Sequence, residues 1–220
     1  MSWQGDLIIS SCASYFAGKG YYVNTNFAVP GTEIILDAAA AMPRMRELKA
    51  RLRKGFAPTG ILNHLIEREW VTLDDIAKES GYPVTFVGRI LEEAAGDDWI
   101  EFNMGPTGPR ARITNYRTPA KECVLFFLGA AGFEEKMENL RKLEGCFSRA
   151  FFVFPYAIDD AATEKIVSKG IGVLRYYQQQ GIFQETVPSD HFRIDKPGCF
   201  AKLVEKILYD NMWILSQSII

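Results

Sequence analysis

One short segment carries most of the chemical information in this sequence. Residues 121–129, KECVLFFLG, form an apolar run behind a charged start, which predicts a buried β-strand. A metal-dependent nuclease needs a carboxylate and a lysine on such a strand, because carboxylates hold Mg²⁺ and a lysine helps to activate water for phosphodiester cleavage. The strand shows Phe126 and Leu128 instead. This strand therefore lacks the two groups that such chemistry requires.

A second segment concentrates positive charge. Residues 42–55, MPRMRELKARLRKG, hold six cations against a single acid, Glu47. On a helix, Met45, Leu48 and Leu52 form an apolar side while the cations cover the rest. Two interpretations stay open: a solvated, salt-bridged face, or a patch that contacts the phosphates of nucleic acid. The six cations are Arg44, Arg46, Lys49, Arg51, Arg53 and Lys54.

The order of predicted elements indicates an α/β protein. Residues 3–18 have near-helical apolar spacing, and residues 21–29 and 33–40 predict two strands joined by a turn at Pro30 and Gly31. Strands at 123–128, 149–154 and 171–177 alternate with helices at 133–143 and 159–169, which is typical of parallel strands joined by crossovers. The apolar helix that follows Pro197 is expected to pack on the core, and a dimer contact is the alternative.

The middle of the chain predicts a separate unit. An amphipathic helix over residues 61–70 precedes Thr72, which can cap a short helix ending at Gly81. A third helix follows Pro83, and strands on either side of a Gly/Pro-rich tip complete the unit. Residues 58–118 resemble a winged helix through core and turn positions, namely Leu73, Ile76, Ala77, Gly81, Val87 and Leu91.

The winged-helix resemblance implies contact with DNA through the third helix and the wing. The third helix offers Arg89 together with Glu92 and Glu93, so its charge is poorly suited to a polyanion. The wing offers Arg110 and Arg112. The resemblance therefore adds three candidate nucleic-acid-binding residues to the six of the basic segment.

The outer frame is similar to the PD-(D/E)XK nuclease-like superfamily. GYYV, PGTEIILDA and KECVLFFLG match its first three strands, and residues 148–177 match its later βαβ half. The resemblance implies a restriction-endonuclease-like mixed sheet flanked by helices. It also implies a domain of residues 1–56 and 119–220, with a winged-helix domain of residues 57–118 inserted. We therefore expect the strand at 33–40 to lie beside the strand at 123–128.

The superfamily's active site is incomplete in this sequence. Its E-x-K positions fall on Phe126 and Leu128, and GTEIILD lacks the usual placement of the aspartate. If catalysis survives, the resemblance implies that migrated carboxylates hold Mg²⁺; otherwise no cofactor is expected. The carboxylates concerned are Glu33, Asp37, Glu122 and Glu134.

Composition limits the class of protein. With 220 residues, 48% hydrophobic and 24% charged, the chain is not disordered or collagen-like. A net charge of −2 means that any nucleic-acid surface must come from local clustering. Four scattered cysteines without a C-x-x-C pair, and two distant histidines, argue against a metal site and favour reduced thiols. No apolar run approaches a membrane span of ~20 residues, and we expect a cytoplasmic protein.

These observations predict a nucleic-acid-associated binding or regulatory protein on a catalytically degenerate scaffold, with duplex DNA as partner. One alternative is an active Mg²⁺-dependent DNA endonuclease. The other is a winged-helix module that binds proteins.

Overall fold

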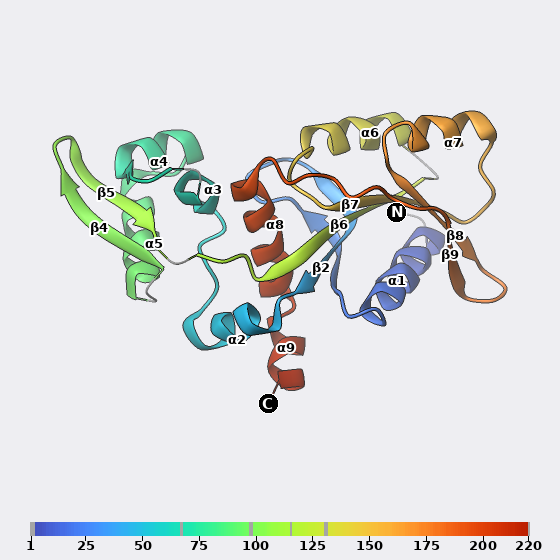
Figure 1. Ribbon diagram of the computed structural model, residues 1–220, viewed down its shortest axis with the longest axis horizontal. Helices are drawn as coiled ribbons and strands as arrows, with labels where there is room; N and C mark the ends of the chain where they lie inside the picture. The colour runs from blue at the N-terminus through green and yellow to red at the C-terminus, as the bar shows by residue number, and fades with distance from the viewer. Residues whose placement is uncertain (1–2, 67, 97–98, 115, 130–131, 220) are drawn as a thin grey trace.

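The computed structural model describes residues 3–66, 68–96, 99–114, 116–129 and 132–219. A six-stranded mixed sheet in the order β1-β2-β6-β7-β8-β9 forms the larger part of the molecule (Figure 1). Strands β6, β7 and β8 run parallel, and the other neighbours are antiparallel. The strands are β1 (Tyr22–Ala28), β2 (Ile35–Pro43), β6 (Ala120–Leu128), β7 (Arg149–Phe154), β8 (Gly172–Tyr177) and β9 (Ile182–Val187).

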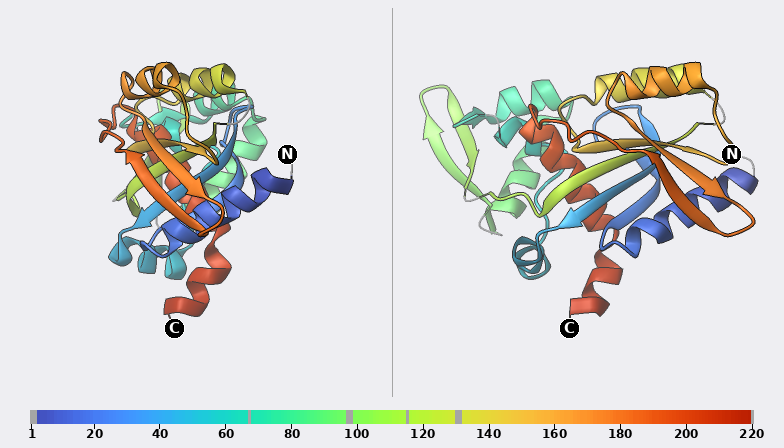
Figure 2. Two further views of the ribbon diagram at one scale, coloured as in Figure 1. Left: turned by 90° about the vertical axis from the view of Figure 1, so that its right-hand side faces the viewer. Right: turned by 45° about the vertical axis from the view of Figure 1, so that its right-hand side comes forward.

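Helices cover both faces of this sheet. The face that includes Leu125 and Phe127 packs against α6 (Phe133–Lys142), α7 (Asp160–Val167) and α8 (Pro197–Asp210). The face that includes Phe126 packs against α1 (Trp3–Ala17). Because the central strands are covered on both sides, their side chains are apolar at successive positions, as the sequence predicts. The views in Figure 2 show the sheet between these layers.

Strand β2 lies between the helices through its smallest side chains. Residues 38–41 are four alanines, all fully buried, which point alternately toward α1 and toward α8. Strand β2 pairs with β6 in antiparallel register, with Ala38 opposite Phe126. The prediction that residues 33–40 lie beside residues 123–128 in one sheet is confirmed.

Residues between β2 and β6 build a second, smaller sheet. Strands β3 (Val71–Thr72), β5 (Gly108–Ile113) and β4 (Ile100–Gly105) are antiparallel in that order. Helices α3 (Leu62–Ile66), α4 (Leu73–Ser80) and α5 (Val84–Gly96) pack beside them around Ile76, Val87 and Leu91. The expected caps are present: Thr72 Oγ1 accepts the Asp75 N–H at 3.1 Å, and Gly81 ends α4 with φ 73°.

Some elements differ from the sequence prediction. Helix α3 ends at Ile66, earlier than expected, and residue 67 lies outside the described residues. Strand β9 was missed, because Phe183 is its one buried residue and an edge strand of this kind gives a weak alternating pattern. The C-terminal helix divides at Asn211 into α8 and α9 (Met212–Ile219), and α9 projects from the body (Figure 2).

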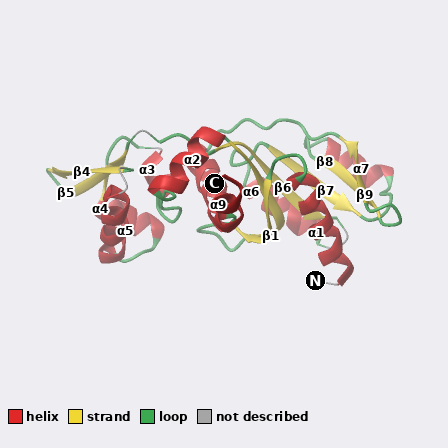
Figure 3. Ribbon diagram, turned by 90° about the horizontal axis from the view of Figure 1, so that it is seen from below, coloured by secondary structure: helices red, strands yellow, loops and turns green. Residues whose placement is uncertain are grey.

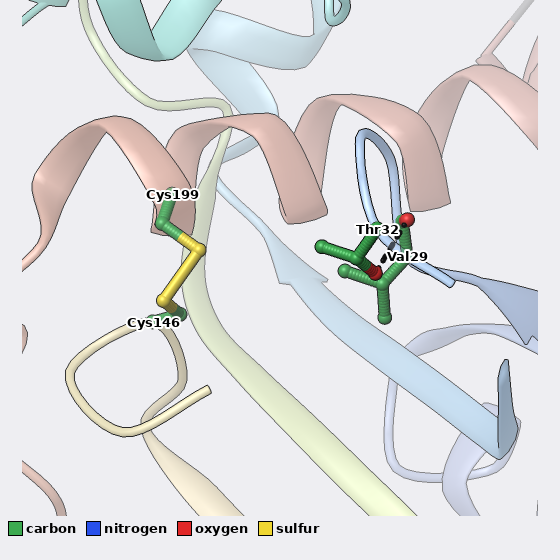
Figure 4. Close-up of a disulfide and its surroundings, with 4 residues drawn as sticks. All are labelled: Val29, Thr32, Cys146 and Cys199. Atoms are coloured by element: carbon green, nitrogen blue, oxygen red, sulfur yellow. Dashed lines mark hydrogen bonds between the residues drawn. A yellow bond between two sulfur atoms is a disulfide. The ribbon is translucent and has the colours of Figure 1, made fainter. Parts of the chain in front are cut away.

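A disulfide corrects the expectation of four reduced thiols. Cys146, in the loop after α6, is bonded to Cys199 in the first turn of α8 (Figure 4), with the Cα atoms 5.2 Å apart. The pairing was hidden because the two cysteines are 53 positions apart in sequence. Cys12 and Cys123 are unbonded and buried, and burial raises the pKa of each thiol to about 12. These two thiols are therefore poor nucleophiles.

Helix α8 also joins the two sheets. Its first turns pack on α3, where Ala57, Leu62 and Ala201 form a small buried cluster. None of the helices in the described ranges is long and apolar enough to cross a membrane.

Candidate functional site

Asp37 lies where β2 meets the carboxyl end of β6, and it is paired with a lysine. Its Oδ2 accepts the Leu128 N–H at 2.8 Å and lies 2.9 Å from Lys136 Nζ. Lys136 also donates to the Leu128 carbonyl at 2.7 Å. The sequence prediction missed Lys136, because this lysine comes from the first turns of α6 and not from β6. The sequence did offer one indication of this role: Lys136 belongs to α6, the helix that directly follows β6.

The other candidate carboxylates lie elsewhere. Glu122 is near the start of β6, so six residues and about 20 Å of strand separate it from the Asp37 end. There it accepts the Tyr21 hydroxyl at 2.6 Å. Glu33 is exposed in the turn between β1 and β2, and Glu134 is exposed and paired with Lys165 at 2.5 Å.

The four carboxylates therefore do not converge on one point. In addition, no group of three His, Cys, Asp or Glu residues suited to a metal ion occurs within the described ranges. Asp37 already has one cation and one backbone N–H as partners, so its charge is compensated within the chain.

The two positions aligned with the expected acid and lysine are part of the core. Phe126 is fully buried, with its ring stacked on Phe151 at 6.1 Å and edge-on to Phe16 at 4.5 Å. Leu128 is also buried on the α1 face. A charge at either position would be surrounded by apolar groups without a partner, which is strongly unfavourable.

Helix α2 (Met45–Lys54) divides the basic segment into two faces. Arg51 points inward and is 1% exposed. Its Nε and Nη2 donate to Glu205 Oε1 at 3.0 and 2.7 Å, and Nη2 also donates to the Arg117 carbonyl at 2.7 Å. The guanidinium lies 4.4 Å from the centre of the Trp99 ring. Arg51 is thus a buried structural cation, and its inclusion among the phosphate contacts requires correction.

Glu205 shares this buried site with a tyrosine. The Tyr116 hydroxyl donates to Glu205 Oε1 at 3.0 Å, while Oε2 is buried without a hydrogen-bond partner in the described structure. Burial raises the pKa of Glu205, and the charge and hydrogen bonds of Arg51 oppose that rise. The site therefore holds α2, α8 and the segment before β6 together.

The outward face of α2 has a different character. Arg46, Lys49 and Arg53 are exposed, and none has an acidic partner among the described residues. Glu47, the one acid of the helix, lies on the inner side, 4.0 Å from Arg51. Arg44 donates its Nε to the Ala120 carbonyl, and Lys54 is exposed at the end of the helix. At Arg46, Lys49 and Arg53 this surface is therefore solvated, whereas the ion pairs of the segment lie on its inner side at Arg51.

The remaining candidate cations have partners. Arg89 lies 4.0 Å from Glu93 and against the Phe86 ring. Arg110 and Arg112 lie over the Trp70 ring, 4.9 and 4.8 Å from its centre, and Arg112 also bonds Glu101. The β4–β5 hairpin forms one end of the molecule, whereas α2 lies beside α9 (Figures 1 and 3). The two basic sets thus belong to different parts of the surface.

Comparisons with protein-family models, curated proteins and solved structures give no match for this chain. Functional inference depends on the site geometry alone.

Proposed function

We propose that this protein binds nucleic acid through the phosphate backbone, with the outer face of α2 as the principal contact. The observation that carries this proposal is the set of three exposed cations, Arg46, Lys49 and Arg53, without acidic partners among the described residues. A chain with a net charge of −2 has little long-range attraction for DNA, so a local patch must supply it. Backbone contacts of this kind carry no sequence information, and binding is expected to be weakly specific.

We also infer the finer fold assignments. The order of β1, β2, β6 and β7, with α6 as a crossover, supports a restriction-endonuclease-like sheet. The order α3, β3, α4, α5, β4, β5 supports a winged helix as the inserted unit, with residues 57–118 as the domain boundaries. Duplex DNA is the expected partner, and the cytoplasm is the expected location.

The scaffold is proposed to be catalytically silent. A Mg²⁺-dependent nuclease needs carboxylates that meet at one strand end, and here Asp37 and Glu122 lie at opposite ends of β6. Phe126 and Leu128 fill the other two positions with core side chains. The Asp37–Lys136 pair would then have a structural role, in which it joins β2, the carboxyl end of β6 and α6.

Salt-dependent binding tests the role of α2. Fluorescence anisotropy with a labelled duplex at several salt concentrations should give weak binding, with Kd on the order of 10⁻⁴–10⁻⁶ M near physiological salt. Replacing Arg46, Lys49 and Arg53 with Ala should weaken binding and reduce the slope of log K against log salt by up to about 3, since each phosphate contact contributes about 0.9.

A matched variant separates local contact from net charge. Replacing three exposed cations outside α2 with Ala removes the same charge, and binding should change little because electrostatic effects beyond ~10 Å are screened. Equal slopes for wild type and the α2 variant would refute the proposal. An equal loss of DNA affinity in both variants would show that net charge, and not a contact at α2, is responsible. The control cations are Lys142, Lys169 and Arg193.

A further inference from the structure

A groove opens between the β1–β2 turn and α5, and Arg46, Lys49 and Arg53 are not among its lining residues. It encloses about 490 Å³, and its apolar side chains come from three segments of the chain. The turn lies beside α8, as Figure 4 shows through Val29 and Thr32. The lining residues are Pro30 and Gly31 of the turn, residues 56 and 58–60 of the loop after α2, and Tyr82, Phe86, Ile90, Glu93 and Ala94.

The groove presents aromatic rings to solvent. Tyr82 is 39% exposed and Phe86 36% exposed, with ring centres 5.1 Å apart. Val84, next to them at the start of α5, is 44% exposed. Large apolar side chains gathered at one exposed site are typical of protein-binding surfaces, where aromatic anchors dominate the affinity.

A lysine of α8 lies beside Gly31, at the rim of the groove. Lys202 of α8 is half-buried, and it forms no hydrogen bond or ion pair with the described residues. Its Nζ lies 3.3 Å from the position that a Cβ on Gly31 would occupy. Burial lowers the pKa of Lys202, as expected for an ammonium group that has lost water without gaining an anion. A carboxylate arriving at this rim would supply the missing counter-charge.

The lining favours peptide over nucleic acid. Glu93 is the one charged side chain among the described lining residues, and an acid disfavours a polyphosphate. One side of the Tyr82 ring contacts Gly60, where an added Cβ would lie 3.3 Å from Tyr82 Cε2. Arg89 covers one face of Phe86 at 5.2 Å. The faces on which bases would stack are therefore partly occupied.

We propose that this groove binds an extended segment of a partner protein, one that places aliphatic or proline side chains against the exposed surfaces of Tyr82 and Phe86 and a carboxylate at Lys202. Aromatic-lined grooves accept proline-rich segments because such segments are already extended and lose little conformational entropy on binding. Lys202, unpaired among the described residues, then selects segments with an acidic side chain and fixes their direction. This function is independent of the α2 surface.

Selection from a phage-displayed library of random 12-residue peptides tests the proposal on the full chain. Enriched peptides should share an acidic residue next to proline or aliphatic residues. Binding of a labelled, selected peptide should weaken about tenfold or more in Phe86→Ala and in Lys202→Met, since charge-assisted bonds and buried aromatic anchors each have effects of that size. Tyr156→Ala removes a 50% exposed aromatic ring outside the groove and should leave the affinity within about twofold.

A double-mutant cycle identifies the ion pair. Changing the acidic residue of the peptide to its amide should weaken binding to wild type, yet have little further effect on Lys202→Met. Thermal melts establish that each variant is folded. The proposal would be overturned if the enriched peptides lack an acidic residue, or if peptide affinity is unchanged in both Phe86→Ala and Lys202→Met. Loss of oligonucleotide binding in Phe86→Ala would also overturn it, because nucleic acid would then be the occupant.

Discussion

Replacement of Arg51 by Met is expected to destabilise the protein far more than replacement of any exposed cation of α2. The substitution keeps most of the side-chain volume but removes three hydrogen bonds, two to Glu205 Oε1 and one to the Arg117 carbonyl. Glu205 is fully buried and would lose Arg51, its one cationic partner among the described residues. Breaking a buried ion pair from one side costs about 3–5 kcal/mol. For a chain of this size, that corresponds to a fall in Tm of roughly 6–20 °C.

The loss of stability in Arg51→Met should also depend on pH, and it should be larger at higher pH. Burial raises the pKa of Glu205 in the folded protein, and loss of Arg51 raises it further. The folded state then binds a proton more tightly than the unfolded state, so stability increases as pH falls. The difference in Tm between wild type and Arg51→Met should therefore be largest near pH 8. This difference should become smaller toward pH 5, as the pH approaches the pKa of a Glu side chain in the unfolded chain, about 4.3.

Urea unfolding and thermal melts at pH 5 and pH 8 provide the measurement. Tryptophan fluorescence follows the unfolding, and Trp99, one of four tryptophans, lies with its ring centre 4.4 Å from the Arg51 guanidinium. Arg53→Met, two residues away on the exposed face, is the matched control and should change stability by no more than about 0.5 kcal/mol. Adding Glu205→Gln to Arg51→Met should recover part of the loss and abolish its pH dependence. If Arg51→Met behaves like Arg53→Met, the reasoning is refuted.

Three further outcomes are expected. Purified protein should not cleave single-stranded, duplex or branched DNA with Mg²⁺ or Mn²⁺, and cleavage that disappears in Asp37→Ala would contradict the silent scaffold. Gly172→Ala should lower the free energy of unfolding in urea by about 1–3 kcal/mol, because the added Cβ would lie 2.8 Å from Ser189 N. As the control, Gly88→Ala on α5 has space for the added Cβ and should be neutral or stabilising by up to about 1 kcal/mol. Helix α9 has no charged residue, and Trp213 is 74% exposed. Sedimentation should therefore reveal a concentration-dependent dimer that Trp213→Glu weakens. A wild-type protein that stays monomeric at all concentrations would exclude this dimer.

Local sequence patterns were sufficient for most elements of the fold. The apolar runs of β6 and β7 predicted strands covered on both faces, and Thr72 and Gly81 predicted both ends of α4. These signals work because capping, turn formation and strand alternation depend on residues a few positions apart. The adjacency of β2 and β6 was also predictable, although 76 residues lie between Pro43 and Ala120, because the unit between them has its own helix and strand pattern.

The sequence by itself determined that α2 would be basic, and the tertiary structure decided which of its cations face water. Arg51 and Arg53 are two positions apart and chemically identical, yet one is buried against Glu205 and the other is exposed. Likewise, Asp37 was a visible candidate, but its partner Lys136 is 99 positions along the chain on another element. Composition limits what a side chain can do, whereas its partner, burial and charge state depend on groups that are distant in sequence and meet only when the chain folds.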